Sequence, residues 1–426
     1  MAEESGKDEL SVNIDEMLHE FSYTASRPST PFIYRVTDSL RSTKETEYDP
    51  IIISIGPLHH GKHNLQAMEP LKMWYLKKLL GDSSVDSYVQ AIRSNEQTAR
   101  DFYAEKIELN TDELVKMLLL DAIFIIQFLR EYDKELGVQE SKGDPIFGFE
   151  HVKSHILRDL MLFENQIPMF IVRDLFQLSN HDNQEFKYLF WPLFQHRRDV
   201  PTVLPEAHHL LGLVHAVKFC SSVQQLLRRI DKPIEMENIL SATELRAAGI
   251  LFKKNPENEN GKDPSLLDIT FKNKTFCIAK LEMTDEMESW LRNMIAYEFY
   301  LPRNKPKCIS DYAFFLKCLM CSSEDAELLR HYGVISNCLG GDARVYEVID
   351  RLMTNVFTSK KFLYLGVFDS INNYSKRKRN RWFAVLRRHH FNNPWTVISV
   401  VAAAVLLSVG IVQMVIAILS FCKLSC

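Results

Sequence analysis

The chain has 426 residues, of which 46% are hydrophobic and 25% charged, and its formal net charge is −4. This length exceeds the size at which one hydrophobic core usually stops growing, so one large domain or two coupled domains are expected. The small net charge argues against nucleic acid as a partner of the whole molecule. The low count of 15 glycines favours helices over a loop-rich all-β fold.

Residues 1–30 are predicted to be partly disordered. They include one short amphipathic stretch, with apolar residues at helical spacing: Leu10, Ile14, Met17, Leu18 and Phe21. This segment lacks the basic start and apolar core of a secretory signal peptide. The eight cysteines show no regular pairing pattern, and Cys318 and Cys321 form an isolated C-x-x-C in a predicted helix. We interpret them as buried free thiols, which suits a cytosolic location.

A histidine-rich turn follows in the stretch ISIGPLHHGKH. Three histidines lie within five residues, with a glutamate downstream: His59, His60, His63 and Glu69. A metal site needs three or four ligands in fixed geometry, and Pro57 and Gly61 oppose the helix that would align two of these imidazoles. We therefore predict a structural turn whose imidazoles hydrogen-bond to backbone and carboxylates. A metal site and a contact with a ligand or partner remain as alternatives.

Residues 111–136 are predicted to form a long helix, which begins at a capping box made by Asn110 and Glu113. This helix is apolar on nearly all sides, which is typical of a central buried helix. Asp121 is interpreted as a buried carboxylate satisfied by its neighbours, with a catalytic role as the alternative. A further helical pair is expected over residues 151–180, interrupted before Pro168.

Alternating apolar residues near 266–281 predict a β-hairpin with its turn in KNK, and GILF is a candidate third strand. Ser241 and Glu244 form a second capping box, and helices resume at Thr284, Ser310, Glu324 and Asp342. The expected fold class is mainly α: a large helical domain over 31–375 with a small antiparallel β element and one C-terminal transmembrane helix.

The C-terminal transmembrane helix is predicted over 395–421, from Trp395 to Phe421, because this stretch has no charged residue and enough length to cross a bilayer. A basic juxtamembrane segment, 376–390, precedes it, and the short tail 422–426 follows. The basic residues expected to face lipid are Lys376, Arg377, Lys378, Arg379, Arg381, Arg387 and Arg388. The charge bias predicts a single-pass, tail-anchored protein with most of the chain in the cytosol. Which membrane it would enter is left open.

Known catalytic templates are missing from the sequence. It has no G-x-x-x-x-G-K-[ST] loop, no G-x-G-x-x-G after a strand, no G-x-S-x-G elbow and no H-E-x-x-H. We therefore predict no catalytic residue, no metal ligand and no cofactor.

Several long motifs occur together and in order, among them IYRVTDSLR, YDPIIISIGPLHHG, LRDLMLFENQIPMFIVRDLF, ATELRAAGILFK and RNMIAYEFY. Together they resemble the plant domain of unknown function 247 (DUF247) family, from about Ile33 to the C-terminal segment. The resemblance implies a plant protein that is largely helical, with a C-terminal membrane segment and no established catalytic residues. Some grass members look like self-incompatibility determinants, which implies recognition of partners.

The motif residues that we expect to have structural roles are Gly56, Pro57, His59, His60, Gly61, Glu69, Glu164, Asn165, Gln166 and Pro168. The sequence departs from the family pattern at Thr37, where a proline is frequent, and at Leu58, where an aromatic residue is common. A looser turn is expected near Thr37.

The resulting prediction is a membrane-anchored, mostly helical recognition or scaffold protein in signalling, with membrane lipids and unidentified proteins as partners. The competing prediction is an enzyme of unrecognised type, with a pocket of histidines and carboxylates near His59–Glu69. Convergence of these groups in one cleft favours the enzyme, whereas separate, internally paired sites favour recognition.

Overall fold

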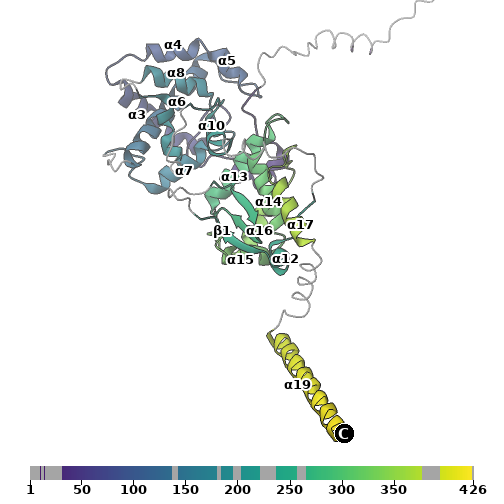
Figure 1. Ribbon diagram of the computed structural model, residues 1–426. Coiled ribbons are helices and arrows are strands. Elements are labelled where there is room, and N and C mark those ends of the chain that lie inside the picture. The colour runs from purple at the N-terminus through teal and green to yellow at the C-terminus, as the bar shows by residue number, and fades with distance from the viewer. Residues whose placement is uncertain are drawn as a thin grey trace, which may run out of the picture.

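The computed structural model describes residues 31–136, 143–179, 184–194, 203–220, 237–256, 265–376 and 394–424, together with residues 10 and 14. Figure 1 shows the N-terminal helices gathered at one end of the molecule and the strands with the later helices at the other. Helices α10 (Leu210–His215) and α13 (Asp285–Phe299) lie where the two ends meet. The buried apolar side chains of both ends belong to one continuous core.

Helix α6 (Thr111–Leu136) is the centre of the N-terminal end, where α3 (Glu69–Leu80), α4 (Asp86–Arg93) and α8 (Met169–Leu178) pack around it. Its capping box is confirmed, because Asn110 and Glu113 each accept a hydrogen bond from the other's backbone amide. The remaining elements of this end are α2 (Asp38–Arg41), η1 (Glu45–Glu47), η2 (His63–Met68), α5 (Glu96–Asp101), α7 (Glu150–Leu160), α9 (Phe186–Leu189) and η3 (Trp191–Phe194).

The other end contains the strands and the later helices. A π-helical turn, η4 (Ala216–Cys220), continues directly from α10. Helix α13 packs against α14 (Cys308–Leu319) and α16 (Asp342–Leu352), and α15 (Ser323–His331) packs against α12 (Ala242–Ala247) and α16. Helices α17 (Leu365–Ser375) and α19 (Pro394–Leu424) complete the order.

Two small sheets accompany these helices. Strands β2 (Ile269–Lys272) and β3 (Thr275–Ile278) form the antiparallel hairpin, and its turn residues Asn273 and Lys274 both have positive φ. Strand β1 (Leu251–Lys254) joins β3 in parallel, and β4 (Leu281–Met283) pairs in parallel with β5 (Ile335–Asn337). The predicted antiparallel hairpin is confirmed, and the candidate third strand forms, beginning within GILF. What the sequence did not predict is the parallel pairing, because segments distant in sequence supply the parallel partners.

The prediction of a transmembrane helix over 395–421 is contradicted. A hydrocarbon core about 30 Å thick requires about 20 consecutive apolar residues in one helix. Within the described residues, no helix combines sufficient length with sufficient apolarity. The predicted single-pass, tail-anchored arrangement, with Trp395 and Phe421 at the ends of its anchor, is therefore not supported. The orientation derived from it is not supported either.

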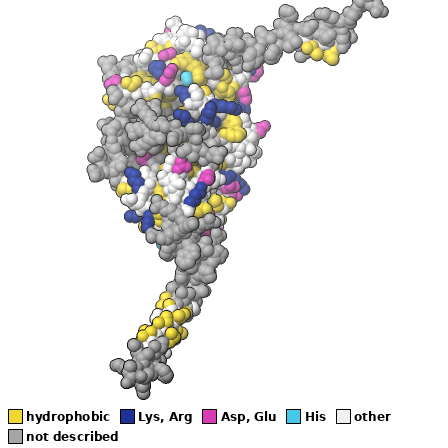
Figure 2. All heavy atoms as spheres, turned by 45° about the vertical axis from the view of Figure 1, so that its right-hand side comes forward, with side chains coloured by type: hydrophobic (Ala, Val, Ile, Leu, Met, Phe, Trp, Pro, Cys, Tyr) yellow, Lys and Arg dark blue, Asp and Glu magenta, His cyan; other side chains and the backbone are white. Residues whose placement is uncertain are grey.

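The basic segment before α19 lies almost entirely outside the described residues, as does most of 1–30. Lys376 is described, and its ammonium group pairs with the Glu237 carboxylate. Figure 2 shows basic, acidic and apolar side chains interspersed over the visible face of the body, and apolar side chains along α19.

Candidate functional site

The histidine-rich stretch 53–63, hereafter the anchored turn, is held from beneath by hydrogen bonds to its backbone. The amide of Ile55 donates to Asn165 Oδ1 over 2.7 Å, and the Asn165 side chain donates to the carbonyl of Ile53 over 3.1 Å. The amide of Gly56 donates to Asp121 Oδ2 over 2.7 Å. These contacts satisfy buried backbone groups of a segment that has no regular secondary structure.

At Gly56 the anchored turn approaches the loop between α7 and α8, residues 161–168, hereafter the motif loop. Its φ is +79°, and a Cβ atom placed there would lie 2.3 Å from the carbonyl oxygen of Gln166. The same carbonyl accepts a hydrogen bond from the Tyr103 hydroxyl. Glycine is therefore required here both for the left-handed backbone and for the close approach.

A buried lysine neutralises the carboxylate beneath Gly56. Lys72 Nζ lies 2.7 Å from Asp121 Oδ1 and 2.6 Å from Glu69 Oε1, and it also donates to the carbonyl of Ser54. Burial lowers the pKa of Lys72, but the carboxylates of Asp121 and Glu69 raise it overall, so the amine stays charged. Burial raises the pKa of Asp121. Asp121 thus has the satisfied, buried environment that its position in the sequence predicts.

His59 and Glu164 form a second polar centre beside the first. His59 Nε2 lies 3.1 Å from Glu164 Oε2, within ion-pair distance but without the alignment of a hydrogen bond. Arg41 and the amide of Val36 each donate to Glu164 Oε1 over 2.7 Å. Burial raises the pKa of Glu164, but contacts with His59, Arg41 and Val36 lower it overall.

The three histidines of the anchored turn do not converge. His59 is buried, whereas His60 and His63 are exposed, as is Gly61 between them. His59 lies beside the Glu164 carboxylate, whereas Glu69 pairs with Lys72. The structure therefore does not assemble the pocket that the enzyme alternative requires. Pro57 is half-buried and precedes the exposed part of the turn.

Gln166 and Pro168 connect the motif loop to the middle of the molecule. The Gln166 amide group donates to the carbonyls of Leu160 and Leu162, and its oxygen accepts from the amide of Leu211 at the start of α10. Pro168 is the residue directly before α8. A cavity next to Asn165 and Gln166 measures about 10 Å³, which is near the minimum that one water molecule needs.

His208 and His209 lie against aromatic rings. His208 stacks on Phe32, and His209 packs against Phe163 and Tyr297. Burial lowers the pKa of His209 to about 3, so its ring is neutral at physiological pH. Its Nδ1 atom accepts a hydrogen bond from the Gly212 amide, which caps α10.

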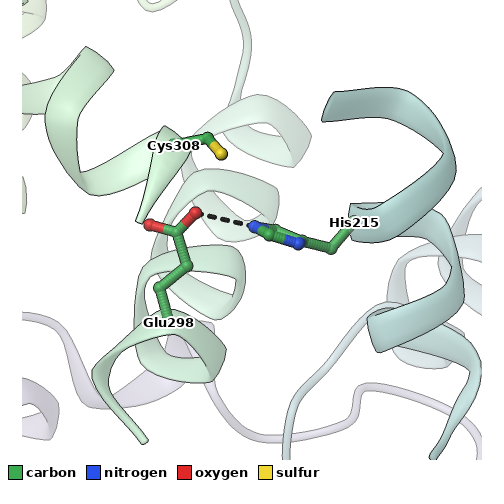
Figure 3. Close-up of side chains that lie close together, drawn as sticks. All are labelled: His215, Glu298 and Cys308. Atoms are coloured by element: carbon green, nitrogen blue, oxygen red, sulfur yellow. Dashed lines mark hydrogen bonds and ion pairs between the residues drawn. The ribbon is translucent and has the colours of Figure 1, made fainter. Parts of the chain in front are cut away.

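A third buried group combines an imidazole, a carboxylate and a thiol: His215, Glu298 and Cys308 (Figure 3). One potential ligand atom from each residue lies within 4.8 Å of the other two, and each side chain is 3% exposed or less. His215 Nε2 is 2.7 Å from Glu298 Oε1. Figure 3 shows the three side chains approaching one another from separate helical segments, namely the ends of α10 and α13 and the start of α14.

Glu298 also binds the first turn of α14. Its Oε1 atom accepts from the Ile309 amide over 2.8 Å, and its Oε2 atom accepts from the amide and hydroxyl of Ser310, both over 2.7 Å. The carboxylate thus satisfies amides that have no partner within the helix and lies at the positive end of the helix dipole. Sequence reasoning missed this cluster because His215 is 83 positions away from Glu298 and no local spacing links them.

The C-x-x-C spans the end of α14, with Cys318 inside the helix and Cys321 beyond it, and it differs from the predicted pair of buried thiols. Cys321 is exposed and Cys318 is half-buried. Desolvation raises the pKa of Cys318 to about 12, which disfavours the reactive thiolate.

Comparison of the sequence with known proteins identifies its family. Residues 33–409 match the DUF247 family, described as "Plant protein of unknown function". The chain is similar to UPF0481 protein At3g47200 of Arabidopsis thaliana, with 27% identity over 91% of this chain and 86% of the relative. It is also similar to putative UPF0481 protein At3g02645 of the same plant, with 21% identity over 90% of each. No solved structure is a significant match.

Proposed function

The chain belongs to the DUF247 family of plant proteins of unknown function. We propose that it is a protein-recognition module rather than an enzyme. The surface proposed for recognition is the exposed part of the anchored turn, with His60, Lys62 and His63. A loop that is already ordered binds better than a mobile one, because less conformational entropy is lost on association.

One observation carries this proposal: the anchored turn is fixed from below and exposed above. Asp121 and Asn165 hold the backbone at Gly56 and Ile55, and a few residues later His60 and His63 project to the surface. Binding residues are frequently found on loops that a rigid scaffold positions. The motif residues from Gly56 to Pro168 would then act as this scaffold.

The internal contacts of two buried carboxylates, Asp121 and Glu164, also support recognition over catalysis. Both oxygen atoms of Asp121 have internal partners, the amide of Gly56 and the Lys72 ammonium group. Glu164 Oε1 accepts from Arg41 and the amide of Val36, and Glu164 Oε2 lies within ion-pair distance of His59. A general acid or base must come within hydrogen-bond reach of a substrate. The adjoining cavity of about 10 Å³ is far below the several hundred Å³ typical of small-molecule sites.

The test uses in-cell chemical cross-linking of the full chain in plant tissue, followed by mass spectrometry. We expect cross-links from the anchored turn to a defined partner, and we expect a double variant, His60→Ala with His63→Ala, to lose them. A matched control replaces two exposed histidines elsewhere, His151→Ala with His331→Ala, and should retain them. Equal cross-linking by both double variants would refute the role of the turn.

A second measurement addresses the enzyme alternative directly. The purified chain is incubated with a plant metabolite extract, and consumption of each compound is followed by mass spectrometry. We expect no time-dependent change. Turnover that Glu69→Gln or His60→Ala abolishes, while the variant keeps its melting temperature, would overturn the proposal.

A further inference from the structure

The buried group of His215, Glu298 and Cys308 brings together three side chains that can each offer a ligand atom to a metal ion. Capping α14 requires only the Glu298 carboxylate, which already binds Ile309 and Ser310. An imidazole and a thiol beside that carboxylate complete a set of nitrogen, oxygen and sulfur donors, each from a different helical segment (Figure 3). We propose that these three residues form a zinc-binding site.

The distances fit a tetrahedral ion after a small adjustment. Zinc binds histidine nitrogen and carboxylate oxygen at about 2.0–2.2 Å and thiolate sulfur at about 2.3 Å, so neighbouring ligand atoms lie roughly 3.3–3.6 Å apart. His215 Nε2 and Glu298 Oε1 are now 2.7 Å apart and would separate by about 0.6 Å. The Cys308 thiol lies within 4.8 Å of one ligand atom of His215 and one of Glu298, and it would move inward.

The surroundings already orient two of the three ligands. Ser310 holds Glu298 Oε2 through its amide and hydroxyl, so the carboxylate stays in place. Oε1 can then bind a metal ion instead of the hydrogen atom on His215 Nε2. The ring of Tyr297 packs edge-on against His215, with 5.2 Å between centroids, and fixes the imidazole plane. His215 is also the last residue of α10 before the π-helical turn η4, a feature that is frequent at functional sites.

The donor set selects the type of ion. A thiolate disfavours magnesium and calcium, which prefer oxygen ligands, whereas mixed nitrogen, oxygen and sulfur donors suit zinc. Three protein ligands leave the fourth tetrahedral position to a water molecule. Zinc would join the ends of α10 and α13 to the start of α14, where the two ends of the molecule meet.

The test is a titration of the reduced, chelator-treated full chain with Co²⁺, a spectroscopic substitute for zinc. We expect one equivalent to bind with a thiolate-to-cobalt charge-transfer band that added Zn²⁺ removes. Cys308→Ser should lose the band and weaken Zn²⁺ binding by more than the roughly 10- to 100-fold that loss of a supporting contact costs. Cys277→Ser, a half-buried cysteine on β3, is the matched control and should behave like wild type.

Two results would overturn the site. One is the absence of a saturable charge-transfer band in the wild-type chain. The other is a band that persists in Cys308→Ser and disappears in Cys318→Ser with Cys321→Ser. A measurement that needs no variant uses X-ray absorption at the zinc edge of the wild-type chain. It should show one sulfur and at least two nitrogen or oxygen ligands, and a shell without sulfur would exclude the proposal.

Discussion

The anchored turn and the His215 group are both buried polar centres, but they neutralise their carboxylates differently. Lys72 pairs with Asp121, and Arg41 pairs with Glu164, so permanent cations balance the charge beneath the turn. Among the described residues, the ion pair of Glu298 is with His215, a side chain that is charged only when protonated. The carboxylates beneath the anchored turn are therefore balanced by permanent cations, whereas Glu298 in the His215 group depends on a helix N-terminus and a titratable ring.

The largest effect on stability is expected from removing Lys72, the cation that pairs with Asp121 beneath the anchored turn. Lys72→Met should destabilise the fold by about 3–5 kcal/mol, because the Asp121 carboxylate would remain buried without its partner. The measurement is urea unfolding of the full chain, with Lys77→Met, an exposed residue of the same helix, as the control. A loss below 1 kcal/mol would mean that the charge of Asp121 is balanced in another way.

Close packing of the anchored turn is tested by a pair of glycines. Gly56→Ala should cost about 2–5 kcal/mol, since it adds a steric clash with the Gln166 carbonyl to the strain of a positive φ. Gly61 has the same φ of +79° but no atom near the added Cβ, so Gly61→Ala should cost only about 1–2 kcal/mol. Equal losses in thermal or urea unfolding would show that backbone strain alone matters.

A smaller effect on stability is expected at the His215 group. Glu298→Gln should cost about 1–3 kcal/mol, because the amide keeps one acceptor for the first turn of α14 but loses the charge. Urea unfolding in the presence of a chelator isolates this capping role from any bound metal. A loss equal to that of Lys72→Met would remove the distinction between the two centres.

The pH dependence of stability tests the buried histidine His209. The pKa of His209 falls to about 3 in the folded chain, so the unfolded chain binds one more proton between about pH 3 and 6.5. Its contribution to stability is therefore complete above pH 6.5 and decreases as the pH falls, by up to about 1.4 kcal/mol per pH unit.

The check on this dependence is urea unfolding at several pH values for wild type and for His209→Gln. The difference between their slopes should shrink above pH 6.5. His60→Ala, which replaces an exposed histidine, is the matched control substitution.

Local sequence signals identified local structure well. The capping box at Ser241 and Glu244, the threonine cap at Thr284 and the turn at Asn273 and Lys274 all occur where the residue types predict them. A helix is expected to resume at Asp342, and α16 does begin at this residue; its carboxylate also pairs with Arg330. That pairing depends on where α15 lies, which no local pattern of residues specifies.

By itself, the sequence determined the mainly helical composition, the central apolar helix and the family, because periodicity, caps and ordered motifs are properties of neighbouring residues. Only the tertiary structure decided which polar residues meet. Glu164 reaches Val36 across 128 positions and His215 reaches Glu298 across 83. Such contacts arise when packed helices bring distant segments together, and burial then requires each polar group to find a partner there.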